Sequence, residues 1–198
     1  MDTEYLIEEK KEMIREQEEI FASTLSLRVL EKPKLSIWMI LIPIIFVYYF
    51  FQYSKFSDAR RQFIEHYLQS RKLALKEAAR AVTEGREPDS GLINPESDMP
   101  AEVRPHHMQV MMLLAEHYEG LLKESGGDFA SLVRGAYGDL TELLIFFNNL
   151  NNAEREVNKA LLPHLEVTHE GVEAAMKRIE EGSADLRREM AEDIFSGK

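Results

Sequence analysis

The chain of 198 residues contains no cysteine, which excludes disulfide bonds, cysteine-ligated zinc sites and cysteine nucleophiles. It also lacks a glycine-rich phosphate loop, the zinc-protease helix motif and the Gly-x-Ser-x-Gly elbow of serine hydrolases. Basic residues are outnumbered, with 24 Lys and Arg against 35 Asp and Glu and a net charge of −11. Because phosphate binding needs a basic surface, we expect no nucleic-acid ligand. We also expect no enzyme activity and no cofactor.

Strand signals are scarce as well, since no segment alternates apolar and polar residues over four or more positions. Apolar residues instead recur every three or four positions, which predicts helices over residues 3–31, 57–84, 106–124 and 168–194. A further helix begins at Phe129, and we expect a break in it near Asn151. Four of the seven prolines fall within residues 85–105, which predicts a long loop. The chain is therefore expected to be all-α, with an antiparallel bundle of about four helices over residues 54–198.

One long hydrophobic run interrupts this pattern, because residues 35–53 contain no charge. As a helix the run spans about 28 Å, close to the thickness of a bilayer's hydrocarbon core. Aromatic residues mark both ends, as in a membrane helix: Trp38, Tyr48, Tyr49 and Tyr53. The alternative is a core helix of a soluble domain, but such helices seldom lack a polar face over this length. We expect a single spanning helix that anchors the chain in a lipid bilayer and separates a tail, residues 1–34, from the bundle.

The charges that flank the run leave its orientation open. Each side carries three Lys or Arg within fifteen residues: Arg28, Lys32 and Lys34 before the run, and Lys55, Arg60 and Arg61 after it. The positive-inside rule therefore gives a tie. A re-entrant hairpin that turns at Pro43, with both ends on one side, also predicts a tie. The spanning helix is favoured here, because half of the run makes an arm too short to bury comfortably.

The N-terminal tail carries a narrow heptad stripe. Two columns of apolar residues recur at every seventh position: Leu6, Met13, Ile20 and Leu27, and beside them Ile7, Ile14 and Phe21. A stripe this narrow is marginal in water on its own and is stabilised by a second helix. We expect these residues to dock on a protein partner or on a second copy of the chain.

Two weak metal-site patterns are present. Glu166 and His169 have the Glu-x-x-His spacing of di-metal bundles, but such sites need two copies and the sequence contains one. Ligands that suit copper(I) cluster at a predicted helix start: His106, His107, Met108 and Met111. Methionines at helical spacing are more often core residues. We therefore assign no metal site.

Together these features favour a membrane-anchored helical protein that acts as an interaction, scaffold or accessory subunit of a membrane complex. The alternative is a sensory or ligand-binding bundle, which requires a cavity between its helices. A metal-dependent bundle enzyme is the third interpretation, and it requires the ligands named above to converge.

Overall fold

A computed structural model describes residues 3–30, 59–93, 99–164 and 169–197. These residues contain no strand, which confirms the all-α prediction, and they form six α-helices: α1 (Thr3–Leu30), α3 (Ala59–Glu84), α4 (Arg104–Lys123), α5 (Phe129–Tyr137), α6 (Leu140–Leu161) and α7 (His169–Ser196). Short 3₁₀ turns, η3 (Ser90–Leu92) and η4 (Leu162–His164), precede α4 and follow α6.

The predicted membrane anchor lies outside the described residues, with Trp38, Pro43, Tyr48, Tyr49 and Tyr53. Of the helices that the structure does describe, none combines the length and the apolarity needed to cross a bilayer. The spanning helix therefore stays a prediction from the sequence.

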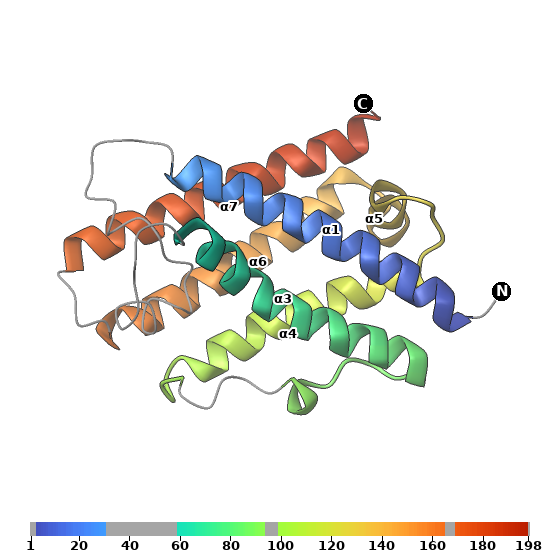
Figure 1. Ribbon diagram of the computed structural model, residues 1–198, viewed down its shortest axis with the longest axis horizontal. Coiled ribbons are helices and arrows are strands. Elements are labelled where there is room, and N and C mark those ends of the chain that lie inside the picture. The colour runs from blue at the N-terminus through green and yellow to red at the C-terminus, as the bar shows by residue number, and fades with distance from the viewer. Residues whose placement is uncertain (1–2, 31–58, 94–98, 165–168, 198) are drawn as a thin grey trace.

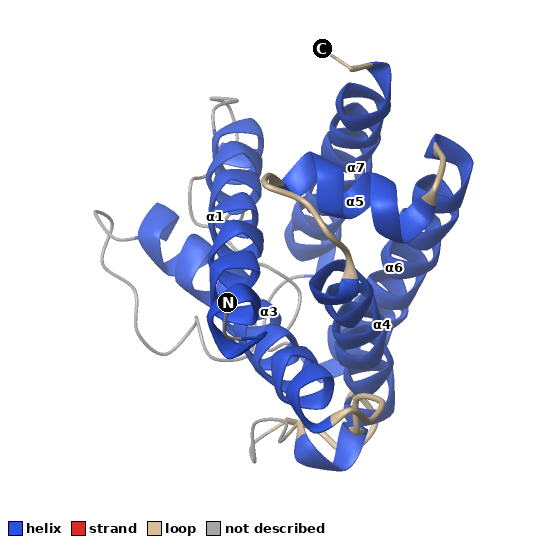
Figure 2. Cartoon of the chain, turned by 90° about the vertical axis from the view of Figure 1, so that its right-hand side faces the viewer, coloured by secondary structure: helices blue, strands red, loops and turns tan. Residues whose placement is uncertain are grey.

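The N-terminal helix packs in the same bundle as the helices that follow it (Figure 1). α1 contacts α3 and α7, α4 contacts α3 and α6, and α6 contacts α7. These five long helices form a ring that encloses two clusters of buried apolar side chains, and the short helix α5 lies crosswise to them (Figure 2). The division into a tail and a bundle therefore does not correspond to two separate bodies.

Burial separates the two heptad columns of α1. The column that faces the core is buried against the chain's own helices: Ile7, Ile14 and Phe21. The neighbouring column lies at the edge, with Leu6 and Met13 half-buried and Ile20 and Leu27 exposed. Other helices of the same chain therefore provide the packing partner that the heptad stripe needs. Because each large buried side chain contributes about 1.5–3 kcal/mol, α1 is held firmly in the bundle.

The long loop predicted at residues 85–105 has a topological reason. α3 and α4 lie side by side and run in the same direction, so the chain must return along the bundle between them (Figure 1). α4 has 20 residues and is therefore about 30 Å long, a distance that roughly ten extended residues cover. Glu77 Oε1 helps to hold this return, accepting hydrogen bonds from Asp89 N–H at 3.0 Å and Arg86 Nη1 at 2.6 Å. The sequence led us to expect an antiparallel bundle. This pair of neighbouring helices is parallel instead.

The helix that begins at Phe129 is broken earlier than predicted. α5 ends at Tyr137, Gly138 has a left-handed φ of 68°, and Asp139 accepts a hydrogen bond from Glu142 N–H at 2.9 Å to start α6. Glycine adopts this φ without the steric penalty of a Cβ atom. The expected break at Asn151 is wrong, because α6 continues through it and the Asn151 side-chain oxygen accepts a hydrogen bond from Arg187.

Replacing Ile14 by Ala should lower the free energy of unfolding by about 2–5 kcal/mol, because the side chain is fully buried and its loss leaves a cavity. Ile20→Ala is the matched control on the same helix. The Ile20 side chain is 59% exposed, and this change should stay within about 0.5 kcal/mol. Urea unfolding of the full chain in mild detergent, followed by circular dichroism, measures both. Equal effects would contradict the placement of α1 in the core.

Candidate functional site

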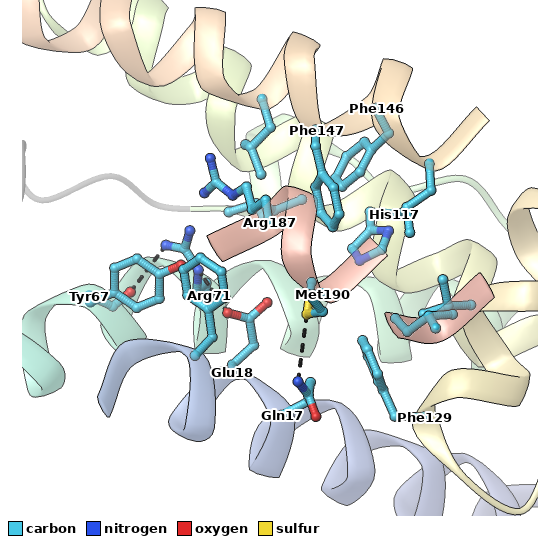
Figure 3. Close-up of a pocket in the computed structure, with 16 residues that line it drawn as sticks. Gln17, Glu18, Tyr67, Arg71, His117, Phe129, Phe146, Phe147, Arg187 and Met190 are labelled. Carbon is cyan, nitrogen blue, oxygen red and sulfur yellow. Dashed lines mark hydrogen bonds and ion pairs between the residues drawn. The ribbon is translucent and has the colours of Figure 1, made fainter. Parts of the chain in front are cut away.

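Four charged side chains, all largely buried, meet at the centre of the bundle. Glu18 comes from α1, Arg71 from α3, Glu154 from α6 and Arg187 from α7. Glu18, Arg71 and Arg187 are visible beside an aromatic cavity in Figure 3. Two carboxylates face two guanidinium groups, so this charged cluster is neutral overall. Neutrality is what allows it to sit in the core.

The carboxylate of Glu154 lies between the two arginines. Arg187 Nη1 and Nη2 donate to Glu154 Oε2 and Oε1 at 2.7 and 2.8 Å, which is a bidentate pair. Arg71 Nη2 donates to Glu154 Oε1 at 3.1 Å, and Arg71 Nε lies 2.9 Å from Glu18 Oε2. The hydroxyl of Tyr118, on α4, donates to Glu18 Oε1 at 2.7 Å. The charged cluster therefore joins all five long helices.

Pairing keeps these groups charged. Burial opposes the ionised form of Glu154, but the charges and hydrogen bonds of Arg187 and Arg71 outweigh it and hold the pKa of Glu154 below its usual range. For Arg187 burial likewise opposes the charge, and Glu154 raises its pKa. Arg71 also lies over the ring of Tyr67, with its Cζ atom 3.5 Å from the ring centroid. Because Glu154 and Arg187 lie on different helices, their bidentate pair holds α6 and α7 in position.

The aromatic cavity next to the cluster is small (Figure 3). Its volume of about 30 Å³ has room for only a few water molecules. His117 Nδ1 lies 2.6 Å from the Tyr137 hydroxyl, and the His117 ring stacks on Phe146 with centroids 4.4 Å apart. Burial, helped by the charge of Arg187, lowers the pKa of His117 well below its ordinary value. A neutral imidazole in an aromatic wall is a packed core residue that keeps one polar contact.

A second hollow, of about 640 Å³, opens between α6 and α7. Its walls carry charges of both signs that pair with one another, as Arg155 does with Glu180 at 3.4 Å and Lys177 with Glu181 at 3.8 Å. Three basic and four acidic side chains line it, so the charges are nearly balanced and the hollow has no strong preference for anions or cations. We assign no ligand to it.

The metal ligands considered from the sequence do not form a site among the described residues. His107 and Met111 are buried in the core, whereas His106 and Met108 are partly exposed. Glu166 and the side chain of His169 lie outside the described residues. Within the described ranges, no group of three His, Cys, Asp or Glu side chains is placed to hold a metal ion.

The charged cluster was not predicted from the sequence, although a signal was available. The apolar stripe of α3 passes from Tyr67 to Ala74, and Arg71 occupies the core-facing position between them. Glu154 lies in the same way between the buried Leu150 and Val157 of α6. A charge at a core-facing position indicates a buried partner of opposite sign. The spacing does not reveal which helix supplies that partner.

No known protein family, curated protein or solved structure matches this chain. The fold therefore carries no function by relationship, and a helical bundle alone implies none. Its function is inferred from the residues and their geometry.

Glu154→Leu should lower the free energy of unfolding by about 3–5 kcal/mol, because Arg187 is left buried without its carboxylate. The double variant Glu154→Leu/Arg187→Met should recover most of this loss, since it removes both charges. The control is Glu156→Gln on the same helix, which breaks an exposed ion pair with Lys159 that water already screens, and it should have little effect. Denaturant unfolding compares the variants. Losses that simply add in the double variant would contradict a coupled pair.

A buried histidine predicts a loss of stability in acid. The His107 ring is buried, neither of its nitrogens has a hydrogen-bond partner in the described part of the chain, and burial lowers its pKa from 6.5 to about 4. Between these values the unfolded chain binds a proton that the folded chain does not. Stability therefore falls as the pH falls through this window, by up to about 3 kcal/mol at 1.36 kcal/mol per unit.

The His107→Leu variant isolates this contribution, because it removes the group that titrates and keeps an apolar side chain in its place. Denaturant unfolding at several pH values from 6.5 to 4 should show a shallower decline for the variant than for the unchanged chain. The shift at His117 acts in the same direction and is present in both proteins. Identical declines would contradict a neutral, buried His107.

Proposed function

We propose that the chain is a membrane-attached helical scaffold that serves as an interaction or accessory subunit of a membrane complex. The observation that carries this proposal is the position of the apolar run 35–53 in the sequence. It follows α1 and precedes α3, two helices of one bundle. A run of this length and apolarity matches the hydrocarbon core of a bilayer. Such a chain brings a folded, acidic bundle to a membrane surface.

The edge of α1 supports a protein contact. Ile20 and Leu27 are 59% and 37% exposed, and they lie seven residues apart, the spacing at which one helix packs on another. The rest of this exposed face is rich in Glu, which anionic headgroups repel. A helical protein partner or a second copy of the chain therefore fits this edge better than a lipid surface does.

One observation favours a second candidate, the ligand-binding bundle. The aromatic cavity is lined by aromatic rings such as Phe146 and by a few charged side chains, Glu18, Arg71 and Arg187, which is the mixture of apolar walls and few polar groups that ligand sites use. Its volume of about 30 Å³ leaves room for only a few water molecules. Ligand binding would require the bundle to open, so the interaction function is better supported.

Fractionation of membranes followed by purification in mild detergent tests the proposal. The full chain should stay with the membranes after a carbonate wash and should then co-purify with a partner or as a dimer. The double variant Ile20→Asp/Leu27→Asp should lose the partner or the dimer and keep its helical circular dichroism, because both side chains are exposed.

Ile145→Asp is the matched control, because Ile145 is an exposed apolar residue of similar size, 54% exposed, on a different helix. It should retain the complex. If the double variant keeps the same oligomeric size and the same partners, the exposed edge of α1 is not the docking surface.

A further inference from the structure

We propose that the bundle meets the membrane with the end at which α1 stops and α3 starts, so that both flanks of the intervening apolar run lie on the same side of the bilayer. This inference rests on the membrane attachment proposed above. It replaces the spanning helix that hydropathy alone favours with a one-sided arrangement.

α1 and α3 are neighbours that run in opposite directions (Figure 1). The rings of Phe21 and Tyr67 stack with centroids 5.7 Å apart, and Val29 and Phe63 belong to the same buried cluster. The last turns of α1 therefore lie against the first turns of α3. The chain before the run and the chain after it are held at the same end of the bundle.

A spanning helix conflicts with this packing. Its two ends stand about 30 Å apart on opposite faces of the membrane, so the bilayer would separate α1 from α3. The ion pair between Glu18 and Arg71 and the hydrogen bond from Tyr118 to Glu18 would both be lost. Ile14 and Phe21 would lose their burial as well. A one-sided arrangement keeps all of these contacts.

The short arms, which count against a hairpin on hydropathy alone, still match the depth of one leaflet. Residues 35–53 suffice for one crossing, whereas two crossings need about 40 apolar residues. Pro43 divides the run into two arms that as helices reach roughly 12–15 Å, about half of the hydrocarbon core. Proline also lacks the N–H group that a turn in lipid would leave unpaired. The run can thus return to the face from which it entered.

The flanking charges then identify the face. With both ends on one side, the six basic residues near the run add up instead of cancelling: Arg28, Lys32, Lys34, Lys55, Arg60 and Arg61. The positive-inside rule places such a surplus on the cytoplasmic side, where anionic headgroups attract it. The basic residues of both flanks then favour the same side of the membrane. We place the bundle at the cytoplasmic leaflet.

Because the chain has no cysteine, single cysteines report the side of each helix without background labelling. Glu16→Cys on α1 and Lys76→Cys on α3 replace exposed side chains outside the charged cluster. A membrane-impermeant maleimide should label both variants in carbonate-washed inside-out vesicles. In right-side-out vesicles the labelling of both should be lost until detergent opens the membrane.

Labelling of the two variants from opposite sides would overturn the one-sided arrangement in favour of a spanning helix. Labelling of both only from the outside would overturn the assignment to the cytoplasmic leaflet. Release of the chain by the carbonate wash would instead contradict the membrane attachment itself, so the two proposals fail in different ways. Circular dichroism and thermal unfolding of each variant in detergent show that neither cysteine disturbs the bundle.

Discussion

The pairing of Glu154 with Arg187 and Arg71 is the constraint on which the arrangement of the helices depends. Each of these charges is out of water, so the loss of one leaves a partner buried and unpaired. Apolar faces tolerate small shifts along a helix, whereas a bidentate pair is made in one register only. We infer that the charged cluster sets the register of α3, α6 and α7, and that Glu18 extends this control to α1.

The two helices that flank the apolar run in the sequence both contribute to this charged cluster. α1 precedes the run, α3 follows it, and the ion pair between Glu18 and Arg71 ties the two helices together. A partner bound at Ile20 and Leu27 would therefore contact a helix that is connected to the centre of the bundle and is followed in the sequence by the apolar run. That connection is consistent with the scaffold role proposed for the chain.

Helix positions were predictable from the sequence because they depend on residues close together in the chain. The helix expected over residues 57–84 matches the observed α3, Ala59–Glu84, over all of the residues that the structure describes there. The break at Gly138 was missed because the apolar residues of α5 and α6 keep the same phase across it. Only the glycine and the capping Asp139 mark this break, and the asparagines further on were a stronger but misleading signal.

The sequence by itself determined the structural class, the long apolar run and the heptad columns of α1, since each follows from the spacing of neighbouring residues. Only the tertiary structure decided that Ile7, Ile14 and Phe21 pack against the chain's own helices and that Arg71 and Arg187 share Glu154. The physical reason is that spacing describes one helix at a time. Which helix faces meet depends on the path of the chain between the helices. Here that path includes the long loop that connects the parallel helices α3 and α4 (Figure 1).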